Sequence, residues 1–152
     1  MVEGRYSPRD LGFEALVKAL VGEHAKMKQG LSRVEEATER RDFEEVSKAL
    51  RELDLIFRQH ILDEESTILR LLVKELGVKA AEEEIKVFQQ HRPIHQLMQE
   101  VAELASMSAD KLVDKQWELN ALFLRHTSAE EHFVFPRATS CYLAQRKGPP
   151  PP

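Results

Sequence analysis

The sequence is poor in cysteine and in long apolar runs, and each shortage excludes a class of protein. A single cysteine, Cys141, cannot form a disulfide within the chain, so a small domain held together by cross-links is excluded. There is no run of about 18 apolar residues, the length needed for a membrane-spanning helix. The opening residues MVEGRYSPRD lack the apolar segment of a secretory signal. These absences predict a cytoplasmic protein with no membrane partner.

An excess of positive charge is also missing. The chain has 26 aspartates and glutamates against 22 lysines and arginines, a net charge of −4. Proteins that bind phosphate backbones present basic surfaces, so nucleic acid is not an expected partner. Charged residues make up 32% and hydrophobic residues 42% of the chain, a balance typical of amphipathic helices. Its 152 residues suit one domain with one core.

Apolar residues recur at helical spacing in the first half of the chain. A first helix is predicted over residues 10–40, after the Ser7-Pro8 pair, which is typical of a helix start. A second is predicted to begin after Asp42, a favourable N-cap residue, and to end near Gly77, a favourable C-cap residue. Each predicted helix has one apolar stripe.

The second half repeats this organisation. A third helix is predicted over residues 78–105, and a fourth is predicted to begin near Ser108. Four helices with short connections favour an all-α, up-down-up-down antiparallel four-helix bundle. We assign residues 1–145 to the bundle and predict that residues 146–152 form a disordered, proline-rich tail.

One sequence frame, F-x-x-H-x-x-x-E-E, occurs twice. Its copies are FRQHILDEE at Phe57–Glu65 and FLRHTSAEE at Phe123–Glu131. In each copy the histidine and the first glutamate replace apolar residues on the stripe of a helix, so they face the core. A buried carboxylate costs several kcal/mol unless a partner compensates for it. The frame therefore predicts such a partner.

The other helices also carry histidines on their apolar stripes. His24 lies in the middle of the first stripe, and His91 and His95 lie one turn apart on the third. Counting from each turn at about 1.5 Å per residue places these groups at similar heights along the bundle. The residues expected to converge as metal ligands are His24, His60, Glu64, His91, His95, His126 and Glu130. The sixth histidine, His132, is expected on the surface.

Imidazole and carboxylate donors together suit iron, manganese or zinc, and the lack of cysteine ligands excludes softer metals. Seven convergent groups are too many for one ion and suit two. Ferritin-like di-iron proteins have a glutamate three residues before histidine, and none of the six histidines here has one. That class is excluded by spacing.

The order and spacing of these residues resemble the hemerythrin-like, or HHE cation-binding, domain over about residues 10–137. Shared features are a lone histidine on the first helix, H-x-x-x-E on the second, H-x-x-x-H on the third and H-x-x-x-E-E on the fourth. The resemblance implies two iron ions with a bridging oxo or hydroxo group. It also implies that dioxygen, or another small diatomic ligand, binds reversibly at an open position on one iron.

The resemblance further implies a role for each ligand. One iron would be held by His91, His95 and His126, the other by His24 and His60, with Glu64 and Glu130 as bridges. Oxygen-carrying hemerythrins have an aspartate at the offset of Glu131. We prefer Glu130 as the bridge because it lies on the buried stripe. The longer glutamate is expected to alter the bridge and hence the oxygen chemistry.

Several details stay open at this level. Pro93 predicts a kink in the third helix, and a second possibility is that the freed carbonyl of Gln89 supports a ligand ring. Glu65 and Glu131 are either outer partners of the ligands or solvated side chains. The oligomeric state is also open.

Three functions are compatible with this site. We favour reversible dioxygen binding for carriage, storage or sensing, which is not an enzymatic activity. The alternative is a di-iron enzyme or iron-handling protein, acting in peroxide or nitric oxide detoxification, iron-centre repair or iron storage. The third is an interaction module with a vestigial site. The sequence contains no cofactor motif or cysteine pair that would deliver electrons to an enzyme.

Overall fold

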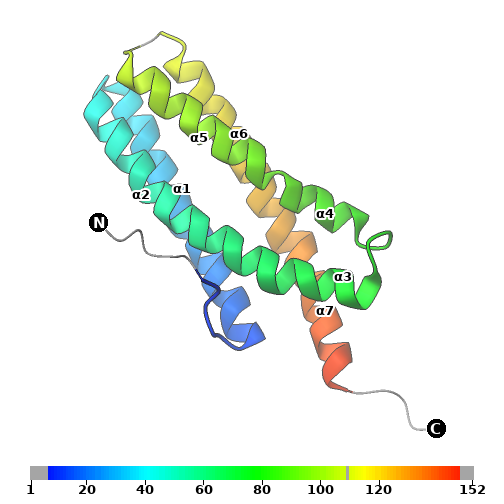
Figure 1. Cartoon of the computed structure of the whole chain (residues 1–152). Helices are drawn as coiled ribbons and strands as arrows, with labels where there is room; N and C mark the ends of the chain where they lie inside the picture. Colours follow the sequence, from blue (N-terminus) through cyan, green and yellow to red (C-terminus); the bar gives the residue numbers. More distant parts are fainter. Residues whose placement is uncertain (1–6, 109, 148–152) are drawn as a thin grey trace, which may run out of the picture.

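The computed structural model describes residues 7–108 and 110–147, and these form four long helical segments (Figure 1). The first segment is α1 (Phe13–Glu39). The second comprises α2 (Phe43–Asp63), the π-helix η1 (Glu64–Leu69) and α3 (Arg70–Leu76). The third comprises α4 (Glu82–Gln89) and α5 (His91–Ser106). The fourth comprises α6 (Leu112–Ala129), the π-helix η2 (Glu130–Val134) and α7 (Phe135–Arg146).

The segments pack as a four-helix bundle, which confirms the predicted all-α fold class. α1 packs against α2, α2 against α5, α5 against α6, and α6 returns to α1 (Figure 1). Segments that follow one another in the sequence are therefore neighbours in space, because their connections are short. Among the described residues, no helix combines the length and apolar character needed to cross a membrane.

Two of the predicted helix boundaries are confirmed by their local chemistry. Asp42 is the N-cap of α2, and its side chain accepts a hydrogen bond from the backbone N–H of Glu45 at 3.2 Å. Gly77 ends α3 with a φ of 84°, in the left-handed region that favours glycine.

Two predicted helix starts are wrong. The first helix begins at Phe13, not after Ser7-Pro8, because the preceding segment is held elsewhere: the Arg9 backbone N–H donates to Asp63 Oδ1 at 2.8 Å. The fourth begins at Leu112, beyond Ser108, whose φ of 50° lies in the left-handed region. The C-terminal tail predicted over 146–152 falls mainly on residues 148–152, outside the described part of the chain.

The third helical segment is interrupted at Gln90, between α4 and α5. Pro93 has no backbone N–H to donate to the carbonyl of Gln89, so a continuous ladder of hydrogen bonds is impossible here. The backbone resumes with a hydrogen bond from the N–H of Ile94 to the Gln90 carbonyl at 3.1 Å. The kink predicted from Pro93 thus appears as a break just before His91.

The apolar core consists of two clusters. One contains Phe57, Phe123 and their neighbours from α1, α2, α5 and α6. The other contains residues such as Leu20, Ile68 and Val134. Along each helical segment, the buried polar residues of the site fall between the two clusters, which therefore cover the site from both ends. Each fully buried large apolar side chain stabilises the fold by about 1.5–3 kcal/mol relative to an exposed one.

Both π-helices begin at the first glutamate of a frame copy, Glu64 in η1 and Glu130 in η2. A π-helical turn accommodates one more residue than an α-helical turn, so it shifts the buried face of the helix. Phe133, seven residues after His126, would share the buried face of His126 in a continuous α-helix, but it is 37% exposed, and Val134 is fully buried instead. The repeated frame thus corresponds to a repeated local irregularity at the site.

Candidate metal centre

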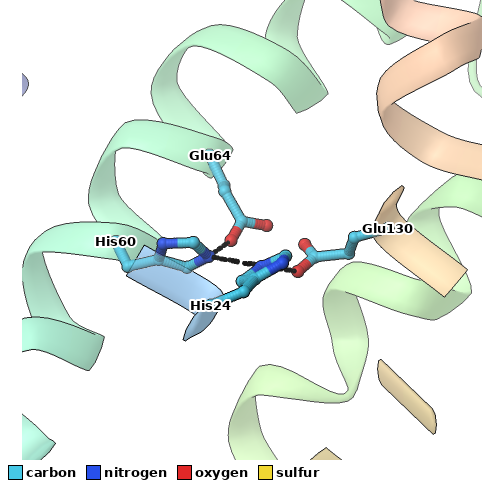
Figure 2. Close-up of side chains that lie close together, drawn as sticks. All are labelled: His24, His60, Glu64 and Glu130. Carbon is cyan, nitrogen blue, oxygen red and sulfur yellow. Dashed lines mark hydrogen bonds and ion pairs between the residues drawn. The ribbon is translucent and has the colours of Figure 1, made fainter. Parts of the chain in front are cut away.

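The structure brings together six of the seven residues predicted as metal ligands. Each of the four helical segments contributes one histidine, and the two glutamates stand at the starts of η1 and η2. Figure 2 shows four of these side chains pointing toward one another. All six are at most 5% exposed, so they are shielded from water. They are His24, His60, Glu64, His91, His126 and Glu130.

The six side chains form two groups that share both glutamates. Within each group, one donor atom per residue lies within 4.8 Å of the others. The first group, on the His24/His60 half, is His24, His60, Glu64 and Glu130. The second group, on the His91/His126 half, is Glu64, His91, His126 and Glu130. Each group could hold a metal ion, and both glutamates belong to both groups.

Distances within the site are those of donors converging on a common centre. Glu130 Oε1 lies 3.1 Å from His24 Nε2 and 3.1 Å from His126 Nε2. Glu64 Oε2 lies 3.5 Å from His91 Nε2, and Glu130 Oε2 lies 3.8 Å from the same nitrogen. Because Glu64 Oε1 also pairs with His60 Nε2, both glutamates reach histidines of both halves.

The site contains buried polar atoms that the described part of the protein leaves without a hydrogen bond. These atoms approach oppositely charged groups of the site, as His126 Nε2 approaches Glu130 and Glu64 approaches His60, but none has a partner in hydrogen-bonding geometry. They are both carboxylate oxygens of Glu64, Oε2 of Glu130, and Nε2 of His91 and His126. In addition, His24 Nε2 and His60 Nε2 face each other at 3.1 Å. Buried polar atoms are rarely left unpaired in proteins. Metal ions between these atoms would be suitable partners for all of them.

On the His24/His60 half, the outer ring nitrogens face carboxylates. His24 Nδ1 lies 3.0 Å from Glu131 Oε1, and His60 Nδ1 lies 3.1 Å from Glu23 Oε1. A carboxylate only accepts, so each Nδ1–H donates outward. When the rings are neutral, the lone pair of each Nε2 is then directed toward the centre, the arrangement usual for metal-binding histidines.

The His91/His126 half repeats the arrangement with one difference. His91 Nδ1 lies 3.2 Å from Glu65 Oε1, and His126 Nδ1 lies 3.0 Å from the amide oxygen Oε1 of Gln90. The ring of His126 is therefore supported by the side chain of Gln90, and not by the backbone carbonyl of Gln89 that Pro93 leaves free.

Sequence reasoning missed two of these four outer partners, Glu23 and Gln90, and left Glu65 and Glu131 undecided. A signal for all four was present, because each stands next to a ligand in the sequence. Glu131 follows Glu130 in the frame. It lies behind His24, whereas Glu130 lies at the centre of both groups, the position expected of the bridge.

The charges of the site shift the pKa values of its groups. Burial alone would lower the pKa of His60, but the adjacent Glu64 and Glu23 carboxylates raise it to about 9. Burial alone would raise the pKa of Glu64, but the neighbouring His60 and His91 hold it well below its usual range. Burial and the positive charge of His91 lower the pKa of His126 to about 3. The metal-free site thus holds a proton on His60, which a metal ion has to displace.

The structure does not bring His95 into the site. Its side chain is 35% exposed and its Nε2 lies 3.3 Å from Asp54 Oδ1, in a groove between α2 and α5. Its partner Asp54 precedes His60 by six residues on α2, so His95 lies beyond the layer of the other histidines, along α2 and away from Glu64. Of the five histidines that the resemblance implies as ligands, four therefore lie together in the structure. His132 is exposed, as predicted.

Comparisons of this chain with protein-family models, with curated proteins and with solved structures found no match. Inference about function therefore depends on the geometry of the site. That geometry is a layer of four histidines and two glutamates, buried in a helical bundle, whose donor atoms are able to hold metal ions.

Proposed function

We propose that this chain is a hemerythrin-like protein that holds two iron ions in the bundle core and reversibly binds dioxygen or another small diatomic ligand. The observation that carries the proposal is the pair of four-donor groups sharing Glu64 and Glu130. Nitrogen and oxygen donors without thiolate suit iron. Two histidines and a carboxylate are a donor set that leaves coordination positions open on non-haem iron.

The charges of the protein suit such a pair of ions. Glu64 and Glu130 are fully buried and place two negative charges between the two halves. Bound iron ions would supply the electrons that a small ligand takes up and returns. The outward hydrogen bonds of the four histidine rings hold their Nε2 atoms in place, so the site needs little rearrangement when ions bind.

Aromatic side chains keep the site dry. Phe135 stacks on the ring of His24, with ring centroids 5.8 Å apart. Phe57 and Phe88 present edges to His91, with centroids 6.2 and 5.5 Å away. A layer of this kind limits the access of water and protons, which favours release of a bound ligand over its further reaction.

A second candidate function is a di-iron enzyme or iron-handling protein. It is favoured by the position of His95, which leaves two histidines on each half. The resemblance to oxygen carriers implies three histidines on one iron, and hence a less reactive ion. With equal donor sets, each ion would have open positions for exogenous ligands. Such a site is suited to reactions in which both ions take part.

The proposal is tested by measuring iron content and visible spectra of the purified protein. The protein is reconstituted with iron, reduced without air, and cycled between oxygen and argon. We expect two irons per chain and a charge-transfer band that appears under oxygen and fades under argon. His60→Gln, which removes a ligand, should lose iron, whereas the matched control His132→Gln, at an exposed histidine, should retain it.

Each outcome favours one function. A band that appears once and does not fade would support the enzyme or iron-handling function over reversible binding. A folded, iron-reconstituted protein without bound iron would refute the metal centre itself.

A further inference from the structure

The metal centre has an approximate two-fold repeat. The two copies of the frame place His60 and Glu64 of the first copy in the same roles as His126 and Glu130 of the second. The outer partners repeat as well. Glu65 follows Glu64 and faces the ring of His91 on the third segment. Glu131 follows Glu130 and faces the ring of His24 on the first segment.

The repeat is broken at one outer position. Glu23 precedes His24 and faces His60 Nδ1 at 3.1 Å, whereas Gln90 precedes His91 and faces His126 Nδ1 at 3.0 Å. Both are hydrogen-bond acceptors at nearly the same distance. Only Glu23 carries a negative charge, so the rings of the His24/His60 half face two carboxylates and those of the other half face one.

Arg9 does not cancel the charge of Glu23. Its Nη2 lies 2.9 Å from Glu23 Oε1, but its Nε lies 2.7 Å from Asp63 Oδ2, and Asp63 is itself a buried carboxylate. The three groups together keep one negative charge. Asp63 stands three residues after His60 in the first frame copy, and the corresponding residue after His126 in the second copy is Ala129. This position therefore supplies a negative charge near His60 and none near His126.

Exposure increases the difference between the halves. The side chain of Glu23 is 13% exposed and that of Glu131 is 26% exposed, both behind the His24/His60 half. Glu65, the one carboxylate behind the other half, is 48% exposed. Water screens an exposed charge more than a buried one, so Glu65 stabilises a nearby cation least.

We propose that the two ion positions differ in affinity, and that the His24/His60 half binds its ion first. This inference rests on the proposed function, because it requires two ion positions. A carboxylate that accepts from the outer nitrogen of a histidine makes the inner nitrogen a stronger ligand. Loss of such a partner typically lowers metal affinity by about 10–100-fold. Glu23 and Gln90 are thus positioning residues that set the order of loading.

The test uses Zn²⁺, which has no redox chemistry and leaves NMR signals sharp. Affinities of the two steps are measured by competition with a chromophoric chelator, and occupancy by the ring nitrogen signals of histidine in labelled protein. At one equivalent of Zn²⁺ we expect the signals of His24 and His60 to shift before those of His91 and His126.

Three variants separate the effect of charge at this position from a general effect of charge. Glu23→Gln should weaken the tighter step at least tenfold. The double variant Glu23→Gln/Gln90→Glu keeps the net charge of the protein and should reverse the order of loading. Glu39→Gln, which removes an exposed charge at the far end of α1, should change neither step.

The order of loading in the unaltered protein decides the inference even if a variant fails to fold. Equal affinities, or earlier shifts of His91 and His126, would overturn the inference and leave the two-ion site intact. Absence of Zn²⁺ binding to the folded protein would instead overturn the proposed metal centre.

Discussion

The metal-free protein should lose stability as the pH rises through the titration of His60. Folding raises the pKa of His60 from 6.5 to about 9, because Glu64 and Glu23 stabilise the imidazolium despite its burial. A group whose pKa is raised by folding stabilises the protein below its unfolded pKa, and this contribution disappears as the pH passes the folded pKa. The loss should therefore occur between about pH 6.5 and 9.

The size of the loss follows from the shift in pKa. Each pKa unit corresponds to about 1.4 kcal/mol, so His60 alone accounts for about 3 kcal/mol of the free energy of unfolding. The pKa of His91 is raised too, against the effect of burial, by Glu64 and Glu65, and it adds to the loss. The pKa of Glu64 is lowered by folding, so Glu64 stabilises the protein at pH values above its ordinary pKa of 4.5. This contribution does not change between about pH 6.5 and 9.

The measurement is urea unfolding followed by far-UV circular dichroism, at a series of pH values, with metal removed by chelation. His60→Gln should flatten the profile, and the difference between the two proteins isolates the His60 contribution from other titrating groups. Metal-loaded protein should not show this loss, because the ion replaces the proton on His60. A metal-free profile as flat as that of the variant would refute the reasoning.

Three further predictions concern other parts of the molecule. Arg137→Leu should destabilise the protein by about 3 kcal/mol in urea unfolding, because it leaves the fully buried Glu84, 2.9 Å away, without its cation; adding Glu84→Gln should restore part of the loss. His95→Ala should leave iron content unchanged, whereas His91→Ala should lower it; loss of iron in the first variant would return His95 to the ligand set. Gly22→Ala should raise stability by about 0.5–1 kcal/mol in thermal unfolding, since Gly22 lies inside α1 and a Cβ there meets no atom within 4 Å.

The sequence by itself determined the four helical segments and six residues of the site. Both follow from local rules. Apolar residues repeat at the helical period, and a polar residue that replaces one of them on the stripe has to face the core. His60 and Glu64, and His126 and Glu130, were identified in this way, since residues four apart on a helix share a face.

Only the tertiary structure decided which polar residues meet. His91 and His95 satisfy the same local rule, but His91 meets Glu64 and Glu130 in the site, whereas His95 meets Asp54 outside it. The π-helical turns, which turn Phe133 outward, have no marker in the apolar period. The contact between His24 and Glu131 joins residues 107 positions apart. Such contacts depend on how helices are aligned in the bundle, and periodicity within one helix carries no information about that alignment.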